Sequence, residues 1–194
     1  RTTVFKDQIS WNILKRFFNG IVPGLILAAV IIYALMQYYD VSSASQIKID
    51  FLKPLIGIYI IWFLYIRKKG KPVSDRAFFA MGGFSGLVTV FIGAAGPLIA
   101  PFFINKDLKK ESIIATKAAC QAIGHIGKIP IFIILFNVTY ISDWQILIPL
   151  IISVYFGTKF GKMMLGKLPE ETFKILFKVA LTIIAIRLII FNII

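Results

Sequence analysis

Six long apolar stretches separated by short polar segments dominate this sequence and limit what it can fold into. A helix needs about 20 residues to cross about 30 Å of hydrocarbon, and several stretches reach that length. At 58% hydrophobic residues, the 194-residue chain has more apolar side chains than a water-soluble domain of this size needs. We therefore predict a single all-α integral membrane domain over residues 1–194. The stretches are Phe17–Met36, Phe51–Ile66, Ala77–Ile104, Ile113–Val138, Gln145–Phe160 and Phe173–Ile194.

Basic residues are unevenly spread over the segments between these stretches. The chain has 22 Lys and Arg against 9 Asp and Glu. The basic residues gather before the first stretch and after the second, third and fifth. The loop after the first stretch has only Lys48, and the loop after the fourth has no Lys or Arg. The positive-inside rule places basic loops in the cytoplasm. We interpret the net charge of +13 in this way and expect no nucleic-acid partner, because no soluble basic domain is present.

This charge pattern fits only if the third stretch enters and leaves the membrane on the same side. Its residues 82–103 read GGFSGLVTVFIGAAGPLIAPFF, with five glycines and two prolines, which disfavour a continuous helix. Each half of the stretch has about 14 residues, or about 21 Å of helix, which is too short to span. We predict a re-entrant hairpin near residues 77–104 that turns at Gly93–Pro97, beside about five full spans.

A weak internal repeat supports the same topology. FLKPLIGIYIIWFLYI (51–66) and TFKILFKVALTIIAIR (172–187) share an apolar start, a lysine and a following apolar run. With the hairpin in place, the first two and last two spans cross in opposite senses. Such inverted repeats are common in secondary transporters, so we predict an inverted-repeat helix bundle.

The fourth stretch carries a polar face. In SIIATKAACQAIGHIGKIPIFIILF (112–136), Lys117, Gln121, His125 and Lys128 fall within an arc of roughly 80° on a helix. Such groups usually face a bundle interior or an aqueous path. Lys117 can also simply reach the cytoplasmic interface, and His125 can be a buried structural histidine. Lys128 lies about 16 residues from the start of its stretch, so its ammonium cannot easily reach the near surface, and a lone ammonium at that depth is costly without an anionic partner.

No carboxylate within the apolar stretches can serve as that partner, since every Asp and Glu lies in or next to a loop. A bound substrate anion can supply the missing counter-ion, and in a membrane scaffold an acidic residue of a partner protein would do so. A broken helix adds backbone N–H groups and a partial positive charge, which also favour anions. We therefore predict a substrate site in which side chains supply charge and hydrogen bonds and two glycines allow close backbone approach. Its residues are Lys128, His125, Gln121, Thr116, Ser85, Gly93 and Gly96.

Enzyme chemistry is not expected. One histidine cannot provide paired haem ligands, and no HExxH, Walker A or Ser-His-Asp pattern occurs. Cys120 is the only cysteine, so the chain has no disulfide framework and no cysteine-rich metal site. We expect no catalytic residue, metal or cofactor.

Three segments resemble the sulfite exporter TauE/SafE family of membrane permeases. They are DQISWNILKRFFNGIVPG (7–24), ATKAACQAIGHIGKIPIF (115–132) and GTKFGKMMLGKLPEETFKILFKVALTIIAIRLI (157–189), and the glycine-rich segment 82–103 is similar to a family element. The resemblance implies export of small sulfur-containing anions, such as sulfite or sulfonates, driven by an ion gradient. Family members usually begin with a further glycine-rich element and helix. With no initiator methionine, we expect this chain to be a fragment lacking the N-terminal part.

The resemblance also implies a multi-pass protein of a prokaryotic cell membrane. Its expected partners are the lipid bilayer, a small anionic substrate, a coupling proton or sodium ion, and a second copy in a homo-oligomer. His125 would suit proton coupling, because histidine changes charge near neutral pH. Two alternatives stay open: a carrier or channel for a non-anionic solute, and a non-transporting membrane scaffold in which the glycines only allow close helix packing.

Overall fold

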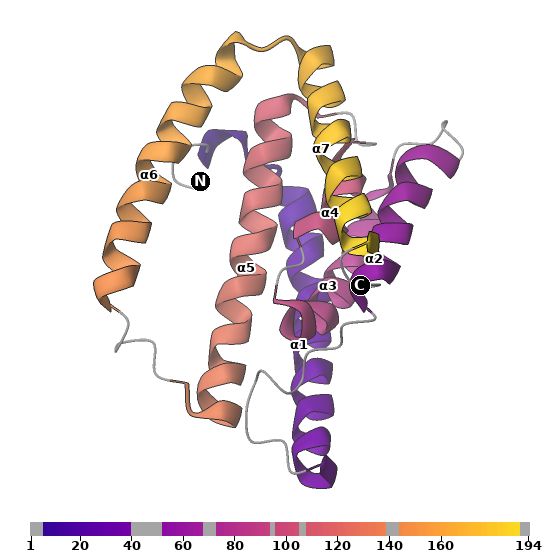
Figure 1. Cartoon of the computed structure of the whole chain (residues 1–194), viewed down its shortest axis with the longest axis vertical. Coiled ribbons are helices and arrows are strands. Elements are labelled where there is room, and N and C mark those ends of the chain that lie inside the picture. The colour runs from indigo at the N-terminus through magenta and orange to yellow at the C-terminus, as the bar shows by residue number, and fades with distance from the viewer. Residues whose placement is uncertain are drawn as a thin grey trace.

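Every regular element that the structure describes is a helix (Figure 1). The computed structural model describes residues 6–39, 52–67, 73–93, 96–104, 108–138 and 144–190. The prediction of an all-α fold is therefore confirmed. The helices are α1 (Trp11–Tyr39), α2 (Leu52–Ile61), α3 (Asp75–Ile92), α4 (Gly96–Ile104), α5 (Lys110–Phe136), α6 (Trp144–Lys167) and α7 (Glu170–Ile190), with a 3₁₀ turn at Lys6–Gln8 and a π-helical segment at Trp62–Ile66.

Four of these helices, α1, α3, α5 and α6, are long and apolar enough to cross a membrane. Helix α2 and its π-helical extension form a shorter apolar helix, Leu52–Ile66. The predicted last stretch corresponds to α7, which carries Lys174, Lys178 and Arg187 between its apolar residues, and residues 191–194 lie outside the described part. A multi-pass helical bundle thus fits the structure, whereas the count of five spans stays a prediction.

Helices α1, α3 and α5 run in the same direction and begin at the same end of the bundle. Near their starts, the Asn12 amide donates to the Asp75 carboxylate at 2.6 Å, and the Ser10 backbone N–H donates to the Thr116 hydroxyl at 2.9 Å. Further along, Ile21 of α1 lies against both Gly86 of α3 and Gly124 of α5. The chain must therefore return to its starting end between α3 and α5, and α4 lies on that return path.

Glycines bring α1 and α3 into close backbone contact. A Cβ on Gly20 or Gly24 would overlap backbone atoms of α3, and one on Gly82 or Gly86 would overlap backbone atoms of α1. Both pairs have the small-xxx-small spacing of close membrane-helix contacts. Helix α3 runs unbroken through Gly82, Gly83 and Gly86, so the prediction that these glycines act as breakers was wrong: their role is packing.

Helices α2 and α7, which contain the two halves of the weak repeat, pack side by side and antiparallel. Gly57 lies against the backbone oxygen of Ala185, and the Tyr65 hydroxyl is 2.9 Å from that of Thr182, which is nearer the start of α7. The Lys178 ammonium also lies 4.1 Å from the centre of the Tyr65 ring. An antiparallel pair is the arrangement that an inverted repeat predicts, although the repeat itself stays a prediction.

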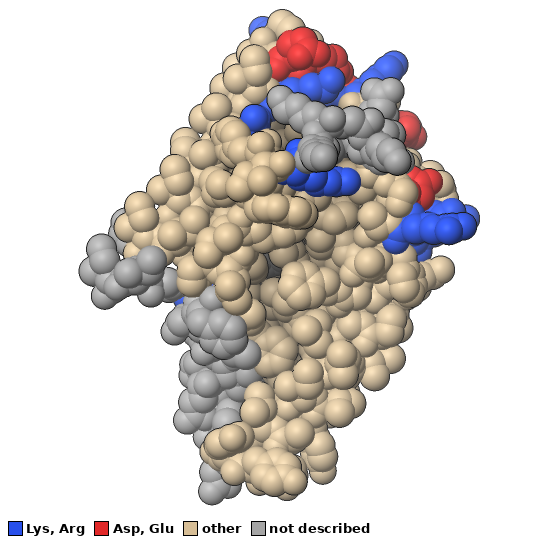
Figure 2. All heavy atoms as spheres, turned by 90° about the vertical axis from the view of Figure 1, so that its right-hand side faces the viewer, with Lys and Arg blue, Asp and Glu red and all other residues tan. Residues whose placement is uncertain are grey.

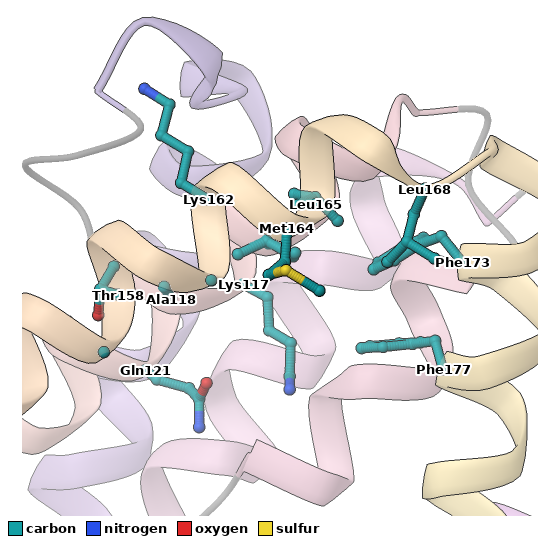
Figure 3. A pocket seen from close by; sticks show the side chains of 13 residues that line it. Lys117, Ala118, Gln121, Thr158, Lys162, Met164, Leu165, Leu168, Phe173 and Phe177 are labelled. Carbon is teal, nitrogen blue, oxygen red and sulfur yellow. The ribbon is translucent and has the colours of Figure 1, made fainter.

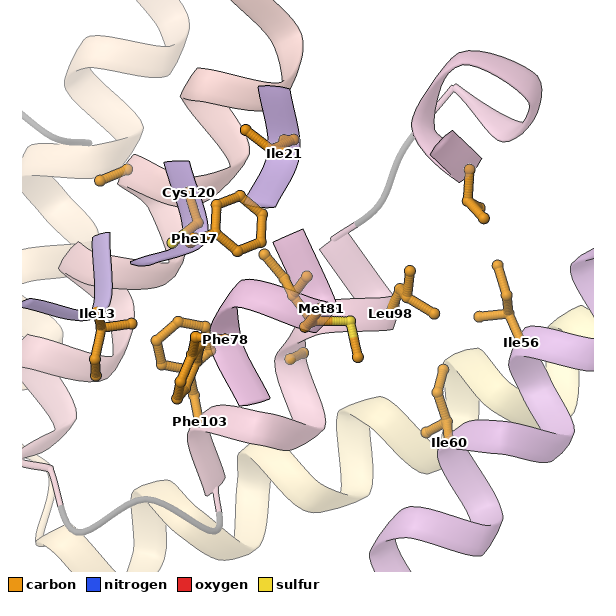
Figure 4. Close-up of a cluster of buried hydrophobic side chains, with 14 of the residues drawn as sticks. Ile13, Phe17, Ile21, Ile56, Ile60, Phe78, Met81, Leu98, Phe103 and Cys120 are labelled. Carbon is orange, nitrogen blue, oxygen red and sulfur yellow. The ribbon is translucent and has the colours of Figure 1, made fainter. Parts of the chain in front are cut away.

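The apolar core lies between α1, α3, α4, α5 and the α2–α7 pair. Figure 4 shows Phe78 and Phe103 close together in it, with ring centroids 5.2 Å apart, and Phe17 is also almost fully buried. Helix α6 stands apart (Figure 1), and every residue in it is exposed except Thr158 and Leu165. On the face seen in Figure 2, the charged side chains of the described residues gather toward one end, and the described surface toward the other end is almost wholly uncharged.

Candidate functional site

Helix α3 ends at Ile92, and its C-terminal cap is Gly93, where the sequence predicted that the chain turns. Gly93 has φ +84°, a conformation that side chains with a Cβ rarely adopt, and its N–H donates to the Thr89 oxygen at 2.9 Å. Helix α4 begins at Gly96. The predicted break is thus present, while Ala94 and Ala95 lie outside the described residues.

The two halves of the broken helix are unequal, in contrast to the predicted halves of about 14 residues. Helix α3 has 18 residues and α4 has 9. Helix α3 is longer because its glycines fit against α1 and keep the helix intact as far as Gly93. Re-entry of the α3–α4 hairpin into a membrane stays a prediction.

Lys128 reaches the break directly. Its ammonium donates a hydrogen bond of 2.6 Å to the Gly93 carbonyl oxygen, at the C-terminal end of α3. That end carries the partial negative charge of the helix dipole, which a cation stabilises. The structure therefore brings together Lys128 and Gly93, two residues that the sequence assigned to one site, although they are far apart in the chain.

A small cavity lies near the break, between α1, α3, α4 and α5; we call it the inner cavity. Its volume is about 10 Å³, which suits about one water molecule. Ser85 is fully buried in its wall, and the Ser85 Oγ has no hydrogen-bond partner among the described residues. The polar residues of the wall are Ser85, Thr89, Cys120, Gln121 and His125.

Three of the predicted site residues, Ser85, Gln121 and His125, thus share this wall. His125 is exposed as a residue and occupies the edge of the cavity, so the alternative of a buried structural histidine was wrong. An unpaired buried hydroxyl costs free energy, typically about 1–3 kcal/mol. Ser85 is therefore a donor or acceptor available to a ligand that enters.

Gly96 faces the side chain of Gln121. A Cβ added to Gly96 would overlap the Gln121 amide nitrogen, Nε2. The prediction that Gly96 allows close approach is consistent with this contact, and the group that approaches is the Gln121 side chain. The N-terminal end of α4, with its partial positive charge, thus lies next to the inner cavity.

Thr116 lies away from the inner cavity. It is fully buried one turn before Cys120, and its hydroxyl accepts the hydrogen bond from the Ser10 backbone. The hydroxyl therefore anchors the segment that leads into α1. A substrate-binding role for Thr116 has no support in this geometry.

A second, larger cavity lies between α5, α6 and α7; we call it the outer cavity. Its volume is about 340 Å³. Lys117 and Gln121 extend side by side from α5, and the Lys117 ammonium lies 5.3 Å from the centre of the Phe177 ring (Figure 3). Lys162 of α6 lines the same cavity but points away from both (Figure 3). Gln121 lines the outer cavity as well as the inner one.

Sequence reasoning missed Thr89 and Cys120 in the inner wall and Thr158 in the outer one. Thr89 follows Ser85 by four residues, so the helical spacing alone could have placed both on one face. Cys120 and Thr158 gave no comparable signal, because their neighbours come from other helices. Among the described residues, no group of three or more His, Cys, Asp or Glu could hold a metal ion.

Comparison with known protein families identifies a match. The model of a family described as sulfite exporter TauE/SafE matches residues 2–188, nearly the whole chain. No match was found among curated proteins or among solved structures.

Proposed function

Because the chain belongs to the sulfite exporter TauE/SafE family, we propose that it moves a small sulfur oxyanion, sulfite or a sulfonate, by ion-coupled transport. The family consists of membrane permeases, so the chain is a multi-pass membrane protein and not an enzyme. The proposal concerns the anion, the coupling and the residues that bind.

The observation that carries the proposal is the contact between Lys128 and the broken helix. Lys128 is held at the break by a carbonyl oxygen, and no Asp or Glu forms the contact. An oxyanion that reaches this point can compete with the Gly93 oxygen for the ammonium. Because Lys is a compact point charge with three donors, it can change partners without a fixed geometry.

The other groups around the break are suited to complete such a site. Ser85 has a buried hydroxyl without a partner among the described residues, Gln121 carries an amide, and His125 lies one turn before Lys128. The inner cavity, at about 10 Å³, is too small for a four-atom oxyanion. In this account the structure is the closed state, and binding needs the hairpin and α5 to separate locally.

The parallel run of α1, α3 and α5 supports a hairpin that enters and leaves on one side. The charged end in Figure 2 then faces the cytoplasm, as the positive-inside rule requires. Inverted repeats with broken helices at mid-membrane are a common plan for secondary transport. These features support ion coupling in a cell membrane, with a proton or a sodium ion as the coupling ion.

A non-transporting scaffold is the second candidate. The glycine contacts between α1 and α3 favour it, because small residues allow membrane helices to pack closely without any transport role. In a scaffold, Lys128 would pair with an acidic residue of a partner protein, and the buried Ser85 hydroxyl, which has no partner among the described residues, would have no role. A carrier of a non-anionic solute would give the Lys128 ammonium no negatively charged group to bind.

A thermal-stability screen in detergent separates these candidates. A ligand at about 100 times its dissociation constant stabilises the folded state by about 2.7 kcal/mol. We expect sulfite, thiosulfate or sulfoacetate to raise the melting temperature of the wild type but not of Lys128→Met. Lys174→Met is the control, because Lys174 forms an exposed pair with Glu171 at 3.7 Å and should leave the effect intact. Equal responses from both variants would contradict the proposal.

A further inference from the structure

Gln121 is the residue that the inner and outer cavities have in common. The outer cavity contacts α5 through Ile114, Lys117, Ala118 and Gln121, and the inner one contacts it through Cys120, Gln121, Gly124 and His125. Since successive turns of α5 face different cavities, the side chain at position 121 forms the wall between them.

The opposite side of this wall is the start of α4. Gly96 lies so close to the Gln121 amide nitrogen that a Cβ at position 96 would overlap it. The Gln121 side chain therefore fills the space between α5 and α4. Removal of its amide would leave a gap at this point and join a cavity of about 340 Å³ to the inner one.

We infer that Gln121 is the gate through which a small anion passes from the outer cavity to the inner cavity. Lys117 lies beside Gln121 on the outer side (Figure 3), so a cation precedes the gate. On the inner side, Ser85 offers a buried hydroxyl. The order of groups along the path is thus ammonium, amide and hydroxyl.

This inference rests on the proposed function, because it takes the inner cavity as the anion site. Its test, however, needs no bound anion. Cys120 is the only cysteine of the chain, lies in the inner wall and is 1% exposed. Its rate of modification therefore reports access to the inner cavity, even in a protein that transports nothing.

The experiment measures modification of Cys120 by sulfonatoethyl methanethiosulfonate, a small anionic thiol reagent, in the full chain in proteoliposomes. We expect slow modification of the wild type and a rate at least about tenfold higher in Gln121→Ala, the change that follows when the closed state loses about 1.4 kcal/mol of preference. An unchanged rate in Gln121→Ala would overturn the inference.

The route is tested by filling the outer cavity. A Cβ on Gly161 of α6 meets nothing within 4 Å, and Gly161 lines that cavity, so Gly161→Trp can occupy it. In the Gln121→Ala background, this substitution should return modification toward the wild-type rate. Gly166→Trp is the matched control: its added Cβ also meets nothing, and Gly166 does not line the cavity. If both tryptophan substitutions slow the reaction, or if neither does, the reagent does not enter through the outer cavity and the inference fails.

General loosening of the bundle is tested at a distant buried position. Ala185 is 0% exposed at the contact between α2 and α7. In a Cys120→Ser background, Ala185→Cys should remain slow to react with or without Gln121→Ala. An equal rise at this position would show that the substitution loosens the whole fold, which overturns the gate. If no anion stabilises the protein in the thermal screen, but Gln121→Ala speeds modification of Cys120 and not of Ala185→Cys, only the proposed function is contradicted.

Discussion

The ammonium of Lys128 donates a hydrogen bond of 2.6 Å to the carbonyl oxygen of Gly93, the residue that caps the C-terminal end of helix α3. This contact joins the middle of α5 to the break between α3 and α4. It gives a single lysine two roles in our account: it stabilises the end of a helix in the closed state, and it supplies charge to an anion when the site opens.

The break itself depends on glycine at position 93. With φ at +84°, Gly93→Ala puts a Cβ in a left-handed backbone conformation that costs roughly 1–2 kcal/mol. We expect a lower melting temperature in detergent. The control is Gly157→Ala on α6, where the new Cβ meets nothing within 4 Å and the helical backbone favours alanine. Equal melting temperatures for the two variants would show that the break tolerates a side chain.

The close contact of α1 and α3 leaves different amounts of space for a side chain at two adjacent glycines, Gly82 and Gly83. Gly82→Ala places its Cβ against the Phe17 backbone oxygen, and such overpacking typically costs about 1–3 kcal/mol. The Cβ of Gly83→Ala would lie 3.4 Å from the Gly20 oxygen, an ordinary contact, so this variant should be close to wild type. Thermal unfolding of both checks the packing, and the reverse order of stability would contradict it.

The start of α5 is capped by a residue from α7. The Glu170 carboxylate accepts from the Lys110 backbone N–H at 3.1 and 3.3 Å, and the Lys110 ammonium binds the Leu168 oxygen. We expect Glu170→Gln to destabilise the protein by about 0.3–1 kcal/mol, because an amide at position 170 keeps one acceptor oxygen but loses the negative charge that the N-terminal end of a helix favours.

Glu171→Gln is the matched control for this cap, because Glu171 is 84% exposed and pairs only with Lys174 among the described residues. Exposed pairs contribute about 0–1 kcal/mol, so this variant should melt near the wild type. Equal effects of the two substitutions would mean that the Glu170 cap adds nothing to stability.

Proton coupling through His125 would make transport depend on pH. Histidine changes charge between about pH 5 and 8, and His125 lies at the edge of the inner cavity, three residues before Lys128. We expect the transport rate to change over that range in the wild type and to flatten in His125→Gln. A rate that is flat from about pH 5 to 8 in the wild type would exclude this role and leave sodium as the coupling ion.

The sequence predicted the helices well where a single apolar run forms one helix. Ile113–Val138 corresponds to α5, Lys110–Phe136, and the polar face of Lys117, Gln121 and His125 follows from helical spacing alone. Helix α6 extends beyond its predicted end at Phe160 to Lys167, because the later residues include charges that an apolar pattern does not count.

What the sequence could not give was the partner of each residue. From the sequence alone, Gly82 and Gly86 are interpreted as helix breakers. Their role in packing is visible only in the structure, where they lie against the backbone of α1. The sequence favoured a substrate-binding role for Thr116, because nothing in its own helix shows that its hydroxyl accepts a hydrogen bond from the Ser10 backbone N–H. The position of Gln121 between two cavities likewise depends on five other helices, and no local pattern encodes it.

The central claim is that Lys128 at the broken helix binds the transported anion, and uptake of radiolabelled sulfite into proteoliposomes tests it most directly. We predict uptake by the wild type and by Lys174→Met. We predict loss of uptake in Lys128→Met, with a helical circular-dichroism spectrum showing that this variant is still folded. Sulfite uptake by Lys128→Met at the rate of the wild type would contradict the account.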